Sequence, residues 1–287
     1  MFKIVRAAAA VFTLTALGAA HAGVVVTPTT DIDTLTNALV APGAGITITG
    51  STLAKGSANQ QGTFDSLNLA PTSGSTPTMT LGGGVALTSG TVLVPNSNTV
   101  NSYSVSPGTG SYAALSTLSG SNTNDSNVLE YEFTLAAGFN AVQMQFLFAT
   151  DEFPTQSVTD IFGFFVDGTN YAKFPNGELV ANKPGSVNFI LNQVGSGLYD
   201  IEWNGLSDIL TVTGLVNTSL STHSLIIGIA DTSDTIYDSA VYMTGLKGVF
   251  STGGGGIGDP NETPEPGTMA LVGIAALAMG AMRRRKQ

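Results

Sequence analysis

Cysteine is missing from the chain of 287 residues, which excludes disulfides, thiol catalysis and iron–sulfur clusters. Histidine occurs only at His21 and His223, so a zinc site built from several His or Cys side chains cannot form. What remains is chemistry based on oxygen atoms: carboxylates, hydroxyl groups and hard cations, or binding without catalysis.

Positive charge is also scarce, and arginine is absent between the two ends of the chain. Charged residues make up 10% of the sequence, against about 25% in an average protein. Apart from Lys3, Arg6 and a C-terminal basic cluster, four lysines stand against all 20 acidic residues, a formal charge of −16. Such a chain repels phosphate, which excludes nucleic-acid binding. Hydrophobic residues reach 43%, enough to bury a substantial core.

The first 22 residues have the form of a secretory signal peptide. A basic start, Met1–Arg6, precedes the apolar run Ala7–Leu17, and Ala20-His21-Ala22 places small residues at positions −3 and −1 of a cleavage site. We therefore expect export, with signal peptidase as a transient partner and a mature chain that begins near Gly23.

The other end of the chain combines three features in order. A Gly-rich linker is predicted at residues 251–263, and Pro264-Glu265-Pro266 follows it. The apolar segment 268–282 comes next, and the basic residues Arg283, Arg284 and Arg285 close the pattern. The apolar segment is shorter than the roughly 20 residues that cross a bilayer comfortably, and the basic cluster favours the cytoplasmic side. A permanent anchor and a transient sorting helix in the inner membrane both remain open.

This tail, residues 264–287, resembles the PEP-CTERM sorting signal in its Pro-Glu-Pro motif, its apolar segment and its basic cluster. The resemblance implies processing by the membrane protease exosortase in a Gram-negative bacterium that makes exopolysaccharide. It implies an address at the cell surface or in the extracellular matrix, and it implies no activity.

Residues 23–250 favour short β-strands. Val128–Leu135 and Ala141–Phe148 alternate between two faces, as half-buried strands do. Further strand candidates are 46–49, 78–81, 92–94, 161–166, 187–191, 206–212, 225–230 and 240–243. A helix is expected at Asp31–Val40, with Asp31 or Asp33 as its N-cap, and residues 95–127 are expected to form loops.

The predicted fold class is therefore all-β. Many short strands separated by Gly and Asn turns are typical of an antiparallel β-sandwich, here of jelly-roll type. One short N-terminal helix and the C-terminal transmembrane sorting helix complete the expected architecture.

Acidic residues stand where the apolar strands of the second half begin or end. Antiparallel neighbours bring such ends together, and carboxylate and carbonyl oxygens gathered there would suit Ca²⁺. The sequence predicts a Ca²⁺ site at Asp151, Glu152, Asp160, Asp231 and Asp238. The alternative is that these acids cap turns and bind nothing.

The same segments carry a family resemblance. They are Phe-Ala-Thr-Asp-Glu-Phe-Pro at 148–154, Asp-Ile-Phe-Gly-Phe-Phe-Val-Asp-Gly at 160–168 and the run from Ala230-Asp231 to Val241. Together with Leu35–Leu39 and Gln61–Phe64, they are similar to the choice-of-anchor L domain over roughly residues 30–250. The resemblance implies a secreted surface protein and supplies no established activity.

These observations favour a structural or adhesive surface protein, stabilised by Ca²⁺ and without catalytic residues. Two alternatives stay open, both with exopolysaccharide as the partner. A glycoside hydrolase needs two carboxylates across a sugar, and the candidates are Glu130, Glu132, Asp151 and Glu152. A carbohydrate-binding module uses exposed aromatic side chains, and the candidates are Tyr171, Tyr199, Trp203 and Tyr237.

Overall fold

The computed structural model describes residues 23–71, 78–157, 160–181, 183–195 and 197–258. The predicted signal peptide at 1–22 and sorting tail at 264–287, with its helix at 268–282, lie outside these residues. In the described ranges, no helix has the length and apolar character needed to cross a membrane.

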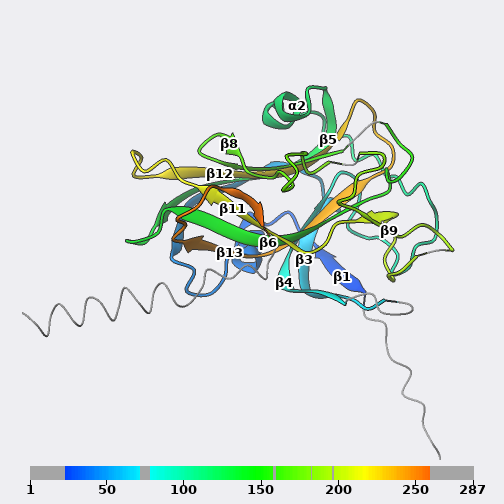
Figure 1. Ribbon diagram of the computed structural model, residues 1–287, viewed down its shortest axis with the longest axis horizontal. Coiled ribbons are helices and arrows are strands. Elements are labelled where there is room, and N and C mark those ends of the chain that lie inside the picture. The colour runs from blue at the N-terminus through cyan, green and yellow to red at the C-terminus, as the bar shows by residue number, and fades with distance from the viewer. Residues whose placement is uncertain (1–22, 72–77, 158–159, 182, 196, 259–287) are drawn as a thin grey trace, which may run out of the picture.

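Short strands dominate the described residues (Figure 1). In chain order the elements are β1 (Val24–Pro28), α1 (Ile32–Leu39), β2 (Ile46–Lys55), β3 (Gln61–Leu69), β4 (Met79–Thr88), α2 (Ala113–Ser119), β5 (Thr123–Leu135), β6 (Ala141–Thr150), β7 (Ile161–Val166), β8 (Thr169–Asn170), β9 (Ile190–Leu191), β10 (Gly205–Leu206), β11 (Leu210–Leu215), β12 (His223–Thr232), β13 (Ser239–Val249) and β14 (Gly256–Gly258).

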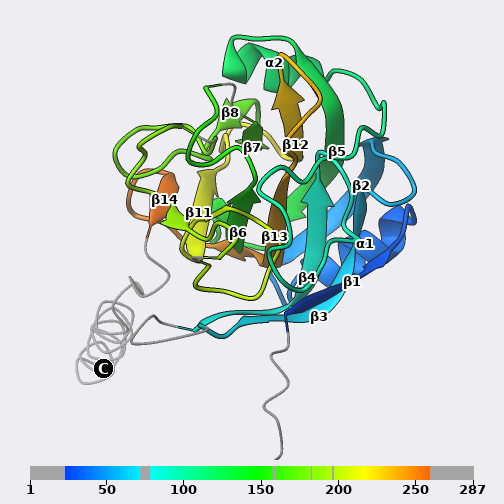
Figure 2. The same cartoon turned by 90° about the vertical axis from the view of Figure 1, so that its right-hand side faces the viewer.

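The strands form two sheets that pack face to face (Figures 1 and 2). The larger sheet has the order β1-β3-β4-β13-β6-β10-β9, and β11 adds to it between β6 and β14. The smaller sheet has the order β2-β5-β12-β7-β8. The pairings between named strands are antiparallel. The predicted antiparallel β-sandwich is confirmed.

Aromatic side chains fill the space between the two sheets. Phe133 of β5, Phe146 of β6 and Phe162 and Phe164 of β7 are fully buried in this core. The rings of Phe146 and Phe162 lie 5.2 Å apart between centroids and so join the two sheets directly. The alternation along β5 and β6 turns Phe133 and Phe146 toward this core, as their sequence predicts.

Each sheet also has a covered outer face. Helix α2 lies over the smaller sheet (Figure 1), where Leu115 packs with Val128 and Phe165. Connecting segments cover the larger sheet, where the indole Nε1 of Trp203 donates to the hydroxyl of Tyr242 at 3.1 Å. Strand β7 is therefore buried on both faces, which explains its continuous apolar sequence.

The helix prediction was right for α1 and incomplete for the rest of the chain. The Asp31 carboxylate accepts from the backbone N–H of Asp33 at 3.1 Å and caps α1 as expected. Helix α2 lies inside the predicted loop region 95–127, and its cap residue, Tyr112, makes no side-chain cap hydrogen bond. Packing of Leu115 stabilises a helix that lacks the usual start signal. The predicted strand at 92–94 is wrong, because these residues form no strand.

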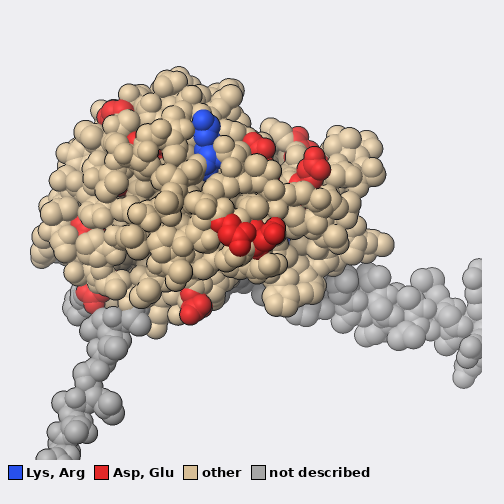
Figure 3. All heavy atoms as spheres, turned by 180° about the vertical axis from the view of Figure 1, so that it is seen from behind, with Lys and Arg blue, Asp and Glu red and all other residues tan. Residues whose placement is uncertain are grey.

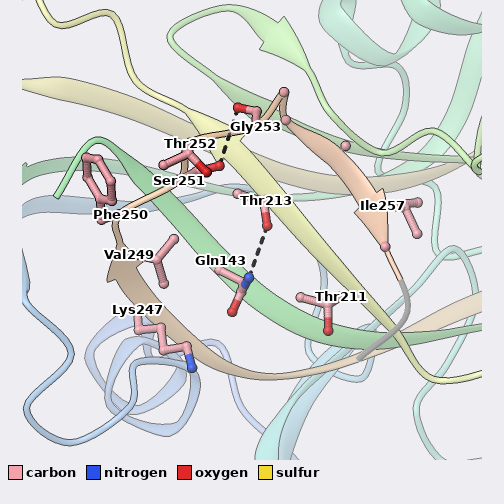
Figure 4. A pocket seen from close by; sticks show the side chains of 14 residues that line it. Gln143, Thr211, Thr213, Lys247, Val249, Phe250, Ser251, Thr252, Gly253 and Ile257 are labelled. Atoms are coloured by element: carbon pink, nitrogen blue, oxygen red, sulfur yellow. Dashed lines mark hydrogen bonds between the residues drawn. The ribbon is translucent and has the colours of Figure 1, made fainter. Parts of the chain in front are cut away.

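The domain continues beyond its predicted end at residue 250. Within the predicted linker 251–263, β14 pairs with β11, and Ile257 is buried opposite Val212. The returning segment forms one wall of an open pocket of about 470 Å³ (Figure 4), with Lys247 and Phe250 in its lining. None of the lining residues is acidic, so this pocket is distinct from the carboxylates described next.

Candidate metal centre

Strand pairing brings the predicted acidic residues together at one end of the sandwich. In the larger sheet, Thr150 lies opposite Ser239, and the Asp151 N–H donates to the carbonyl of Asp238 at 3.0 Å. In the smaller sheet, β7 begins after Asp160 and pairs with the end of β12 that contains Asp231. Electrostatic interaction of Asp238 with both Asp160 and Asp231 joins the two sheet ends.

All five predicted residues are buried at this end. Asp160, Asp231 and Asp238 are 0% exposed, Glu152 is 1% exposed and Asp151 is 2% exposed. An isolated carboxylate is very costly to bury in its charged form. The cluster therefore needs hydrogen-bond donors, protons or a cation.

Most of these carboxylates lack hydrogen-bond donors for some of their oxygens. Both oxygens of Asp160 and both oxygens of Asp231 are buried without a hydrogen-bond partner. The same is true of Oε2 of Glu152 and Oδ1 of Asp238. Leaving a buried charged acceptor unpaired costs several kcal/mol in general terms, so these oxygens point to a missing ligand or to bound protons.

Asp151 differs from the other four, because both of its oxygens are occupied. Oδ1 accepts from the backbone N–H of Asn204 at 3.0 Å, and Oδ2 accepts from the backbone N–H of Tyr103. This carboxylate fixes two connecting segments, which is the turn-capping role that the sequence left as the alternative.

A sixth acid, Asp125 of β5, was missed by sequence analysis. It is 1% exposed, its Oδ1 accepts from the backbone N–H of Gly108 at 2.6 Å, and its Oδ2 has no partner. It lies beside Asn124, which pairs with Asp231 at an irregularity in the β5–β12 ladder. The polar sequence around Asp125 shows no strand pattern. The electrostatic interaction of Asp125 with Asp231 joins two residues that are more than one hundred positions apart in the chain. We call Asp125, Glu152, Asp160, Asp231 and Asp238 the acidic centre.

Within the described ranges, no basic side chain forms an ion pair with the acidic centre. The ion pairs between described residues, Lys183–Glu178 and His223–Asp167, involve other acids. Figure 3 shows how few charged atoms reach one face of the surface, with acidic atoms in several places and basic atoms at one. The negative charge of the acidic centre is therefore buried and internal.

Burial and mutual repulsion raise the pKa values of Glu152, Asp160, Asp231 and Asp238. Desolvation, followed by the charges of neighbouring acids, raises the pKa of Glu152 to about 9 and that of Asp238 to about 8. Burial is also the main cause that raises the pKa of Asp231 to about 8. Burial and the charges of Asp231 and Glu152 hold the pKa of Asp160 well above its usual value. Without a cation, these four carboxyls retain protons near neutral pH.

Burial also raises the pKa of Asp151, to about 7. The hydrogen bonds from Tyr103 and Asn204 act in the opposite direction and favour its ionised form. Asp151 therefore belongs to the same electrostatic environment, although its oxygens serve the connecting segments.

The donor set of the acidic centre fits a hard cation. Its ligands are carboxylate oxygens, and Ca²⁺ takes six to eight oxygens in variable geometry. In the described part of the chain, no three Asp, Glu, His or Cys side chains converge as a ready-made metal cage. Binding of a cation would therefore require side-chain rotations that bring the carboxylate oxygens around a common point.

The glycosidase candidates lie in two different environments. Asp151 and Glu152 are buried in or beside the acidic centre, whereas Glu130 and Glu132 face outward from β5 along a shallow hollow. The carboxylate of Glu130 accepts from the hydroxyl of Tyr112 at 2.6 Å. The sandwich separates the candidates into a buried group and a surface group.

Two of the aromatic candidates for sugar stacking are unavailable to a ligand. Trp203 and Tyr199 are 0% and 2% exposed and belong to the cluster under the larger sheet. Tyr171 and Tyr237 are half-buried, and the Tyr171 hydroxyl donates to the carbonyl of Leu215 at 3.2 Å.

Comparison with known proteins matches two parts of the chain. Residues 25–247 match the choice-of-anchor L domain, and residues 262–286 match the PEP-CTERM protein-sorting motif. No curated protein and no solved structure matches the chain significantly. The sorting motif marks an extracellular protein that exosortase processes. The chain belongs to the choice-of-anchor L domain family.

Proposed function

We propose that this protein is a non-catalytic, structural or adhesive component of the cell surface or extracellular matrix, and that Ca²⁺ bound at the acidic centre stabilises it. The setting would be a Gram-negative bacterium that makes exopolysaccharide. The observation that carries the calcium proposal is the set of buried carboxylate oxygens without hydrogen-bond partners in Asp160 and Asp231.

Calcium is the cation that best fits this chemistry. The centre offers oxygen ligands alone, and it offers more of them than the one or two carboxylates that a typical Mg²⁺ site uses. Zinc prefers nitrogen and sulfur ligands, which this chain cannot gather. A divalent cation would also neutralise part of the charge that the folded protein otherwise buries.

Burial supports a structural rather than a catalytic use of these acids. The carboxylates of Glu152, Asp160, Asp231 and Asp238 are at most 1% exposed, so a polymeric sugar could not reach them.

Direct binding measurements test the calcium proposal. Equilibrium dialysis of the secreted protein, purified without chelator, should detect bound Ca²⁺ with a dissociation constant of about 10⁻⁴–10⁻³ M, the range of extracellular calcium modules. Mg²⁺ should bind more weakly, because it dehydrates reluctantly and demands octahedral geometry. Asp160→Asn should reduce the affinity for Ca²⁺ at least about tenfold, a loss of about 1.4 kcal/mol.

Asp33→Asn is the matched control, since Asp33 is exposed on α1. This variant should bind Ca²⁺ as the parent protein does. Equal calcium affinity in the parent and in Asp160→Asn, or no bound calcium in either, would show that the acidic centre binds no cation.

Processing at both ends gives a separate prediction. The mature protein should begin near Gly23 and lack the Arg283–Arg285 cluster, because both terminal segments match export or sorting signals. Intact-mass analysis of the envelope and medium fractions measures this directly. A full-length 29.3 kDa species as the main form would contradict it, and replacing Pro264-Glu265-Pro266 by alanines should leave precursor in the inner membrane.

A further inference from the structure

One segment without helix or strand, residues 99–109, is attached to the acidic end mainly through its backbone; we call it the strap. Most of its side chains are exposed, Val100 and Val105 at 44% and 41%, and one exception is Tyr103, whose ring packs against Trp203. Its backbone N–H groups face inward instead, toward buried carboxylates. Apart from the Tyr103 ring, the strap is therefore connected to the domain mainly by hydrogen bonds to carboxylates.

Two carboxylates outside the acidic centre bind the first half of the strap. Glu202 accepts from the backbone N–H groups of Thr99 and Val100, each at 3.0 Å. Asp151 accepts from the backbone N–H of Tyr103. Both oxygens of Asp151 and both oxygens of Glu202 are thus occupied by protein donors.

Two carboxylates of the acidic centre bind the second half. Oδ2 of Asp238 accepts from the backbone N–H of Val105 at 2.9 Å, and Oδ1 of Asp125 accepts from that of Gly108 at 2.6 Å. The other oxygen of each carboxylate, Oδ1 of Asp238 and Oδ2 of Asp125, is buried without a partner. Each group therefore gives one oxygen to the strap and keeps the other buried and available to a cation.

We propose that Ca²⁺ binding at the acidic centre orders the strap, with Asp125 and Asp238 as the residues that bridge the cation and the strap. This inference rests on the proposed calcium site. A cation on the other oxygen would fix the position and orientation of the carboxylate, so that the oxygen facing the strap is held where the backbone N–H groups of Val105 and Gly108 donate to it.

The coupling must act in both directions. If calcium favours the closed strap, a closed strap favours calcium by the same factor, because the two equilibria are linked. Since the strap covers the acidic end, it would close where the calcium concentration is high, outside the cell, and open where calcium is scarce. The strap would thus complete the fold after export.

Hydrogen exchange of the full mature protein, measured by mass spectrometry with Ca²⁺ or with EDTA, tests this inference. Amides of residues 99–109 should exchange roughly 5–150-fold more slowly with Ca²⁺, the usual range of coupling between two sites. Amides of 128–133 in the middle of β5 should not change, provided that the temperature stays well below the melting point in EDTA.

A variant that loosens the strap without touching the acidic centre provides the reciprocal test. Glu202→Gln removes one acceptor oxygen from the pair that Thr99 and Val100 use. It should speed exchange of the strap in Ca²⁺ and weaken calcium binding by a similar factor. Glu178→Gln is the control, since Glu178 pairs with Lys183 and contacts no strap residue, and it should change neither property.

The outcomes separate this inference from the calcium site itself. Calcium binding with unchanged exchange of the strap would overturn the inference and leave the calcium site standing. Faster exchange of the whole domain in EDTA, with β5 and the strap opening together, would also overturn it. Absence of calcium binding in dialysis would overturn both.

Discussion

In EDTA, the folded protein is expected to lose stability as the pH rises from about 5 to about 9, and Ca²⁺ is expected to reverse this trend. The carboxyls of Glu152, Asp231 and Asp238 have pKa values of about 9, about 8 and about 8 in the folded protein. In an unfolded chain, such groups titrate near pH 4. The folded state therefore retains protons that the unfolded state has already released.

The direction of the effect follows from this difference. A raised pKa contributes stability that is complete below the unfolded value, and that is lost as the pH rises through the folded value. The loss should therefore extend from about pH 4 to about pH 9 and include Asp160, whose pKa is also raised. One pKa unit corresponds to about 1.4 kcal/mol, so several buried carboxyls together should change the unfolding free energy by several kcal/mol.

Calcium should replace the protons and invert the profile. Its ligands must be deprotonated, so its affinity rises with pH, and a ligand that binds only the folded state stabilises it by about 2.7 kcal/mol at a hundredfold excess over the dissociation constant. At this chain length, each kcal/mol shifts the melting temperature by roughly 2–4 °C.

Melting curves at pH 5, 7 and 9 with EDTA and with millimolar Ca²⁺ measure the profile. We expect a fall in EDTA on the order of 10 °C between pH 5 and pH 9, and a much smaller fall or a rise with Ca²⁺. A melting temperature in EDTA that is constant or higher at pH 9 would mean that the carboxyls do not retain protons in the folded protein.

The fold was predictable where side-chain alternation reports on packing. The alternation of Val128–Leu135 follows the buried and exposed faces of β5, and the apolar run 161–166 coincides with β7. Prediction was poorer where tertiary contacts decide the structure. Helix α2 depends on Leu115 beneath it, and only Ile190 and Leu191 of the expected strand 187–191 pair with β10.

The sequence predicted the members of the candidate site that lie at the ends of recognisable strands. The sequence placed Asp160 and Asp231 at strand ends, and they meet because β7 and β12 are antiparallel neighbours, an order that the sequence pattern did not give. The sequence could not distinguish Asp151, whose oxygens are taken by backbone groups distant in the chain. Asp125 was missed because its polar neighbours resemble a loop, and only the register of β5 against β12 brings it to the cluster.

Replacing Asp231 by asparagine is expected to have opposite effects with and without calcium. Asp231 is buried, has no hydrogen-bond partner for either oxygen and interacts electrostatically with Asp125, Asp160 and Asp238. In EDTA at pH 9, the neutral amide relieves this repulsion and should raise the melting temperature. In calcium, the loss of a carboxylate ligand should lower it, because removing one partner from a buried ionic group costs about 3–5 kcal/mol.

Two matched variants test whether this reversal in the change of melting temperature is specific to Asp231. Asp151→Asn should destabilise the protein in both conditions, because its two oxygens accept backbone N–H groups and an amide supplies only one acceptor. Asp65→Asn, on the exposed side of β3, should change neither curve. The melting temperatures of the three variants in Ca²⁺ and in EDTA show whether Asp231 is a cation ligand or a turn cap. Equal destabilisation of Asp231→Asn in both conditions would make Asp231 a turn cap like Asp151, and the acidic centre would then have no cation to bind.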